Sequence, residues 1–162
     1  MYENYRFQTV NIPRGLKQSI TDSVVKKLKL KDSFQLNDRL DGIYYLNRNI
    51  FRIYSCFCIQ KIFNIQLTYN EKPLFTNQTF KYNNLIHTVV PSKNMDEIKI
   101  PQDSQTNIFL VVLVNEISLT TQYLGMISDK DCERIKVSNK VEESINYITK
   151  KKQITINSNY LR

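Results

Sequence analysis

Apolar residues recur every four positions between residues 16 and 28, which is the spacing of an amphipathic helix. The stripe consists of Leu16, Ile20, Val24 and Leu28, with Val25 beside it. Lysines gather in the last turns, where positive charge suits the negative end of the helix dipole. We therefore predict an N-terminal helix over residues 16–33. We interpret its lysines as a solvated face in preference to a phosphate site.

From residue 50 to residue 70 apolar and polar side chains alternate, and this pattern is typical of strands with one buried face. One parity carries Phe51, Ile53, Phe57, Ile59, Phe63, Ile65, Leu67 and Tyr69. A strand of about twenty residues would exceed the usual three to ten. The pattern thus predicts two strands joined by a bend near Gln60 and Lys61, after a turn at 38–42 and a short strand at 43–46.

The rest of the chain predicts further strands and a helical C-terminal region. One or two strands are expected within residues 75–90, a neighbouring strand at 122–127 and a last edge strand at 153–157. Residues 108–114 are apolar on both parities, which indicates a central strand covered on both faces. Ser128, followed by Asp129 and Asp131, predicts the start of a helix. Ser138 predicts a second helix whose apolar stripe is Val141, Ile145 and Ile148.

These elements predict the α+β class in a single domain, residues 1–162. The expected architecture is a mainly antiparallel sheet of about five to seven strands. One N-terminal helix and one or two C-terminal helices are expected to cover it.

The net charge of +8 is uneven along the chain. Residues 1–60 carry +5 and residues 128–162 carry +3, while residues 61–127 are neutral. Basic ends make nucleic acid an admissible partner, because Lys and Arg release counterions from phosphates. The N-terminus has no secretory apolar region, and no run approaches the roughly 18 apolar residues of a membrane span. We expect a soluble intracellular protein without a transmembrane segment.

Cys56 and Cys58 are the residues that first suggest metal chemistry. A zinc site needs about four ligands, and the chain adds only Cys132 and the single histidine, His87. We therefore predict packed cysteines, with no metal and no cofactor. His87 has no Ser or Cys partner at a catalytic spacing, and no catalytic residue is assigned.

Asp41, Gln60 and Lys61 suggest a different chemistry. An acid on one strand, followed by an acid or Gln and then a Lys on the next, resembles the restriction-endonuclease-like fold, loosely over residues 16–115. That resemblance implies a metal held near the scissile phosphate. Gln60 and Lys61 are adjacent, so on a regular strand they point to opposite faces. An active or degenerate nuclease is therefore the alternative hypothesis.

The leading hypothesis concerns a surface. One face of the predicted strands carries a cation, a ring and amides, namely Arg52, Tyr54, Gln60, Asn64 and Gln66. Such a face suits single-stranded nucleic acid or a protein partner. The neutral middle of the chain favours a protein partner, with nucleic acid left open through the basic N- and C-terminal regions. We expect a non-enzymatic binding or assembly subunit of a larger intracellular complex.

Overall fold

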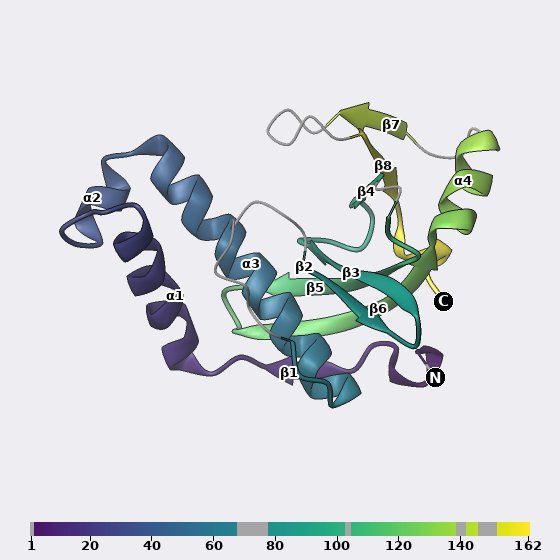
Figure 1. The fold of residues 1–162 in the computed structure, drawn as a ribbon, viewed down its shortest axis with the longest axis horizontal. Helices are drawn as coiled ribbons and strands as arrows, with labels where there is room; N and C mark the ends of the chain where they lie inside the picture. Colours follow the sequence, from purple (N-terminus) through teal and green to yellow (C-terminus); the bar gives the residue numbers. More distant parts are fainter. Residues whose placement is uncertain (1, 68–77, 103–104, 139–141, 146–151) are drawn as a thin grey trace.

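The computed structural model describes residues 2–67, 78–102, 105–138, 142–145 and 152–162, and its centre is a five-stranded mixed sheet (Figure 1). The strands lie in the order β1 (Thr9–Asn11), β6 (Thr120–Ser128), β5 (Ile108–Asn115), β3 (Leu85–Ser92) and β2 (Gln78–Tyr82). The pair β3 and β5 is parallel and the other pairs are antiparallel. A parallel pair needs a crossover connection, and the segment between β3 and β5 provides it.

A second, antiparallel sheet of three strands lies beside the first. Its order is β4 (Ile98–Pro101), β8 (Lys152–Ile156) and β7 (Glu142–Ile145). The α+β class is confirmed, but the expected single, mainly antiparallel sheet is replaced by a mixed sheet and a smaller sheet. The strand predicted at 153–157 is present as β8, but it is the central strand of this sheet and not an edge strand, because it pairs with both β4 and β7.

The second C-terminal helix is also wrong. Ile145 lies in β7, where the register pairs Ser144 with Gln153, and the Gln153 amide donates to the Ser144 hydroxyl at 3.0 Å. Pairing with β8 thus takes the place of the helical stripe. Val141 and Ile148, the other two residues of that stripe, lie outside the described residues.

The largest correction is helix α3 (Leu40–Phe63), 24 residues long, where we predicted strands at 43–46 and from 50 onward. The helix ends at Asn64, whose left-handed backbone (φ 49°) closes the last turn. Ile50, Tyr54 and Cys58 are fully buried at four-residue spacing, and so is Ile59. Apolar residues occupy both odd and even positions because this helix is buried on several sides. The alternation of apolar and polar residues from residue 50 onward therefore does not indicate strands.

A helix lies in each of the two predicted regions, 16–33 and from Ser128 onward, but the first ends at Lys27, and the helix that packs on the five-stranded sheet is α3. Helix α1 (Arg14–Lys27) buries Ile20 and Val24, and a four-residue α2 (Phe34–Asn37) links it to α3. Helix α4 (Asp129–Val137) begins at Ser128, whose hydroxyl accepts a hydrogen bond from the Asp131 N–H at 3.1 Å. Among the described residues, no helix is long and apolar enough to cross a membrane.

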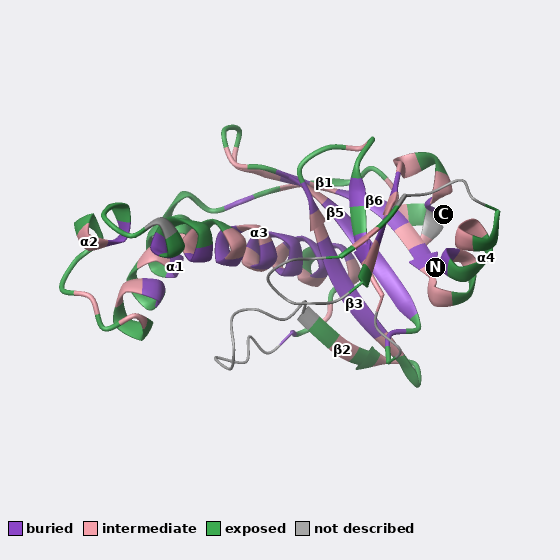
Figure 2. Ribbon diagram, turned by 90° about the horizontal axis from the view of Figure 1, so that it is seen from above, coloured by how far each residue is buried: buried purple, intermediate pink, exposed green. Residues whose placement is uncertain are grey.

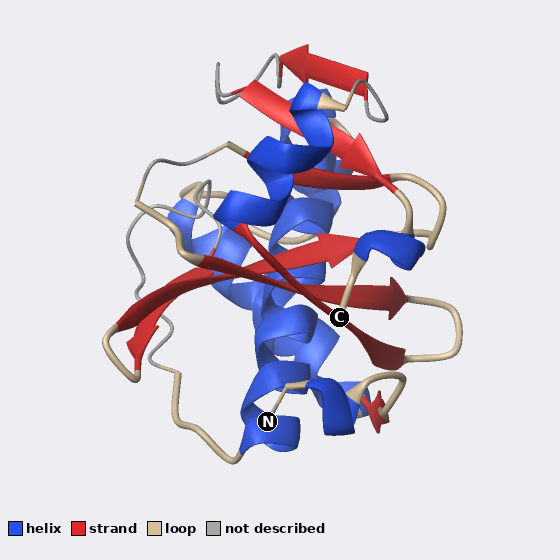
Figure 3. Cartoon of the chain, turned by 90° about the vertical axis from the view of Figure 1, so that its right-hand side faces the viewer, coloured by secondary structure: helices blue, strands red, loops and turns tan. Residues whose placement is uncertain are grey.

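The five-stranded sheet separates two hydrophobic clusters. Val89, Leu110 and Val112 belong to a cluster on one face that continues through α3 to α1. Phe109 and Val111 pack with β4, β8 and α4 on the other. Figure 2 shows β5 buried along its length, as expected for a strand covered on both faces, and Figure 3 shows α3 running behind the strands.

Strand β6 holds segments from both ends of the chain. Phe7 and Gln8 make backbone hydrogen bonds with Tyr123, and Arg162 makes two with Met126. Between them, Gly125 has φ +135°, and a Cβ there would lie 2.6 Å from the Arg162 carbonyl oxygen. Only glycine suits this position, because both the backbone angle and the space exclude a side chain.

Candidate binding groove

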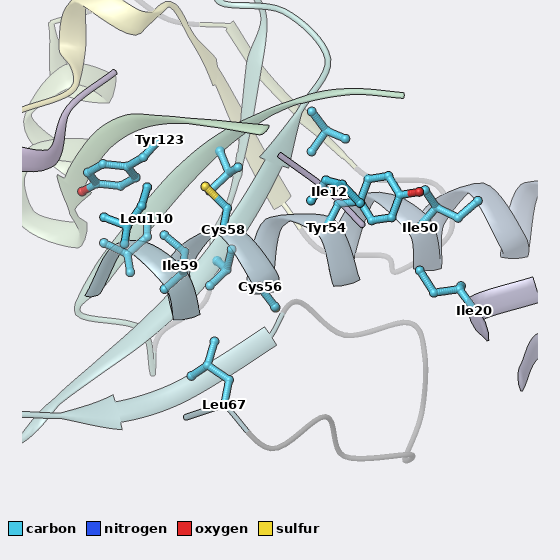
Figure 4. Close-up of a cluster of buried hydrophobic side chains, with 14 of the residues drawn as sticks. Ile12, Ile20, Ile50, Tyr54, Cys56, Cys58, Ile59, Leu67, Leu110 and Tyr123 are labelled. Carbon is cyan, nitrogen blue, oxygen red and sulfur yellow. The ribbon is translucent and has the colours of Figure 1, made fainter. Parts of the chain in front are cut away.

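The five residues predicted to form a binding surface on one strand face do not lie on a common face. They are Arg52, Tyr54, Gln60, Asn64 and Gln66. Arg52 is 6% exposed, and Tyr54 is fully buried in the core (Figure 4). The Gln60 amide donates to the Leu67 carbonyl at 3.3 Å, whereas Asn64 and Gln66 are exposed beyond the end of α3. Successive helical residues rotate by about 100°, so the parity that links them on a strand scatters them around a helix.

The residues of the nuclease alternative do not converge. Asp41 lies in the first turn of α3 and pairs with Arg39 at 2.7 Å, while Lys61 lies in the last turn. At about 1.5 Å of rise per residue, Asp41 and Gln60 are separated by roughly 28 Å. The hydrogen bond from Arg39 lowers the pKa of Asp41, which makes that carboxylate half of an exposed ion pair.

The cysteines are packed side chains. Burial raises the pKa of Cys56 to about 12 and that of Cys132 to about 12. Burial also raises the pKa of Cys58 to about 11, against a hydrogen bond with Thr121 that lowers it. In Figure 4 Cys58 points toward the strands, while Leu67 lies on the other side of α3. In the part of the chain that the structure describes, His, Cys, Asp and Glu form no group of three or more that could hold a metal ion.

His87 is enclosed by aromatic rings. Its Nε2 lies 2.8 Å from the Tyr2 hydroxyl, and its Nδ1 lies 3.1 Å from the Leu85 carbonyl. Phe80 stacks on the ring at 5.2 Å between centroids. Burial lowers the pKa of His87, so the ring is neutral at pH 7 and fastens the N-terminal segment to β3.

A groove of about 510 Å³ lies between α3 and the segment from the end of β3 to β4, and we call it the α3–β4 groove. One wall comes from α3 and consists of Tyr44, Asn47, Arg48 and Phe51. The other wall consists of Pro91, Ser92, Lys93, Asn94, Glu97 and Lys99. This volume is in the range of small-ligand sites.

Helical spacing places the first wall. Tyr44, Arg48 and Phe51 fall at positions i, i+4 and i+7, which lie on one face of an α-helix. From Tyr44 to Phe51 the wall runs about 10 Å along the axis. The Tyr44 residue is 52% exposed, so a large ring is available to a ligand at one end of the groove.

Hydrogen bonds within the loop after β3 shape the second wall. The Ser92 hydroxyl donates to the Asn94 carbonyl at 2.7 Å, and the Asn94 side-chain oxygen accepts from the Glu97 N–H at 2.7 Å. These bonds fix the loop before any ligand arrives. The wall is therefore largely preformed, which reduces the ordering cost of binding.

The groove is positively charged. Among the described residues that line the groove, Arg48, Lys93 and Lys99 are cations and Glu97 is the one carboxylate. The Glu97 carboxylate pairs with Lys99 at 3.5 Å. The Lys93 ammonium lies 5.1 Å from the centre of the Phe51 ring, a cation–π contact across the two walls.

Arg52 lies one turn after Arg48 and adds to this positive charge from beneath the surface. Burial lowers the pKa of Arg52, and the neighbouring charge of Arg48 lowers it further. The electrostatics of the α3–β4 groove thus favour an anionic ligand.

Sequence reasoning missed this site because residues 43–46 and 50–70 were assigned to strands. The signal that could have found one wall is the spacing of Tyr44, Arg48 and Phe51. Residues 91–99 supply the second wall, and nothing in their local sequence indicates that they would lie opposite residues 44–51.

No family model matches the chain, and no curated protein or solved structure matches it either. The groove is therefore interpreted from its own residues and geometry.

Proposed function

We propose that this protein is a non-enzymatic binding or assembly subunit of a larger complex, and that it holds an anionic partner in the α3–β4 groove. One observation carries the proposal: two segments distant in sequence bring three cations together on the walls of one preformed groove, whose described lining contains a single carboxylate. Clefts lined by one sign of charge raise the local concentration of oppositely charged partners.

The state of the nucleophilic side chains supports binding over catalysis. The three cysteines are buried, and their raised pKa values keep them as thiols at pH 7, whereas nucleophilic chemistry needs the thiolate. His87 is buried, with both ring nitrogens engaged. These groups are suited to packing the core.

The fold brings together charges from sequence regions that differ in net charge. Arg48 belongs to the basic N-terminal region, while Lys93 and Lys99 come from the middle region whose net charge is zero. Partner choice follows the local field. The neutrality of the middle region therefore does not count against an anionic partner.

Charge reversal tests the proposal. The test variant combines Arg48→Glu, Lys93→Glu and Lys99→Glu. The matched control combines Lys17→Glu, Lys26→Glu and Lys27→Glu on α1, which changes the net charge equally on exposed residues outside the groove. Binding to labelled oligouridine and to labelled polyglutamate is measured by fluorescence anisotropy at low salt, with circular dichroism to verify folding.

We expect the wild-type protein to bind at least one of the two polymers. The groove variant should lose at least tenfold in affinity, while the control loses much less. If neither polymer binds the wild-type protein, or if both variants lose affinity equally, the α3–β4 groove is not the binding site.

A further inference from the structure

We propose that the partner held in the α3–β4 groove is single-stranded nucleic acid, with a base stacked on Tyr44 and phosphates against Arg48, Lys93 and Lys99. This inference rests on the proposed function and specifies its ligand.

The combination of side chains favours a nucleic acid over an acidic peptide. A polymer of Asp and Glu needs only cations, and an exposed ring contributes little to holding carboxylates. Single-stranded nucleic acid uses both kinds of group, because bases stack on aromatic rings while phosphates follow the positive charge. The walls carry Tyr44 and Phe51 together with three cations.

The two rings have different roles. The Phe51 ring already has a ligand within the protein, because the Lys93 ammonium lies 5.1 Å from the ring centre. Tyr44 is 52% exposed at the other end of the helical wall. Tyr44 is therefore the stacking platform, and the contact with Phe51 positions Lys93 for a phosphate.

The shape of the site favours a single strand over a duplex. The site is concave, about 510 Å³ in volume, and its helical wall is about 10 Å long. Bases in a duplex are stacked on one another and cannot lie against a ring on a groove wall. Unpaired bases can turn outward and stack on an aromatic side chain.

The amides supply hydrogen bonds to base edges. The side-chain oxygen of Asn94 is engaged by the Glu97 N–H, whereas Asn47 is exposed on the same helical wall, three residues after Tyr44. Asn47 is thus placed to bond the edge of a base stacked on Tyr44.

The charges predict a modest salt dependence. Three phosphate contacts on a single strand give a slope of log affinity against log salt of about −2. A purely electrostatic site with more contacts would give a steeper slope.

The experiment compares three probes by fluorescence anisotropy: labelled oligouridine, a labelled RNA duplex of equal length, and labelled polyglutamate. We expect oligouridine to bind the wild-type protein at least tenfold more tightly than either other probe. Tyr44→Ala should weaken oligouridine binding by roughly 5- to 150-fold, the range that base stacking on one ring supplies. Tyr44→Phe keeps the ring and should restore most of the affinity.

Phe34→Ala is the matched control, because Phe34 is a 76% exposed ring outside the groove and its loss should leave binding unchanged. If polyglutamate binds as tightly as oligouridine and needs the three cations, the inference fails while the proposed function stands. An unchanged affinity in Tyr44→Ala, or equal binding of the duplex, also overturns the inference. If no probe binds, both fail.

Discussion

The two halves of α3 differ in burial although they form one continuous helix. The second half, residues 52–63, packs on β3, β5 and β6 and is largely buried. The first half extends past the sheet beside α1 and α2 and presents Tyr44, Asn47 and Arg48 to the α3–β4 groove (Figure 1). The first half also buries Ile50 in the core, and its exposed side chains are held in position without contributing to the core themselves.

The sharpest test of this difference replaces one isoleucine in each half. Ile59→Ala removes a fully buried side chain and should lower the free energy of unfolding by about 2–5 kcal/mol, because a cavity remains. Ile43→Ala affects a 37% exposed side chain of the first half and should change it by less than about 0.5 kcal/mol. Urea unfolding measures both. Equal effects would contradict the division of the helix.

Alkaline pH should destabilise the buried half. The pKa of Cys56 is raised from 9.0 to about 12 and that of Cys58 to about 11. The folded state therefore keeps protons that the unfolded state loses, so stability is complete below about pH 9 and falls as the pH rises. At pH 10 each thiol accounts for a loss of about 1.4 kcal/mol.

Urea unfolding at pH 7 and at pH 10 checks this expectation. Cys56→Ala removes one of the titrating groups and should make the decrease smaller by about the contribution of one thiol. A decrease of unchanged size in that variant would show that other groups cause it.

Arg48→Gln tests the contribution of the first half of α3 to binding in the α3–β4 groove. Removing one cation should reduce the slope of log affinity for oligouridine against log salt by about 0.7. The free energy of unfolding should change by less than about 1 kcal/mol, because Arg48 is only half-buried. A salt titration by fluorescence anisotropy gives the slope. Lys26→Gln on α1 serves as the control and should leave the slope unchanged.

The smallest effect, on thermal stability, is expected for Asp41→Asn at the start of the first half of α3. The pair of Arg39 and Asp41 is exposed, with 46% and 70% of the two side chains accessible to solvent. Exposed pairs add little stability, so the melting temperature should not change measurably. Metal-stimulated cleavage of nucleic acid by the wild-type protein, lost in Asp41→Asn, would instead revive the nuclease alternative.

Sequence reasoning succeeded where a local pattern decides the structure. The stripe through Ile20 and Val24 predicted α1, the cap at Ser128 predicted α4, and the continuous apolar run predicted β5. It failed for α3, because a helix that is buried on several sides can place Ile and Phe at every second position as a strand does. β7 was missed because Ile145 fits a helical stripe, and only pairing with β8 decides against it.

The candidate site was less predictable than the fold. Its helical wall has a recognisable spacing, but its cations belong to segments more than forty residues apart. Their proximity depends on the crossover between β3 and β5 and on the packing of α3 against β3, which are tertiary features. The charge average over residues 61–127 therefore does not reveal that Lys93 and Lys99 lie across the groove from Arg48.

The division of the groove between α3 and the β3–β4 segment also links binding to folding. In an unfolded chain Arg48 and Lys99 are far apart, so a ligand of the groove binds the folded state alone. A ligand present at one hundred times its dissociation constant would then raise the free energy of unfolding by about 2.7 kcal/mol. Thermal unfolding in the presence of candidate ligands thus becomes an assay that needs no label and assumes no chemistry.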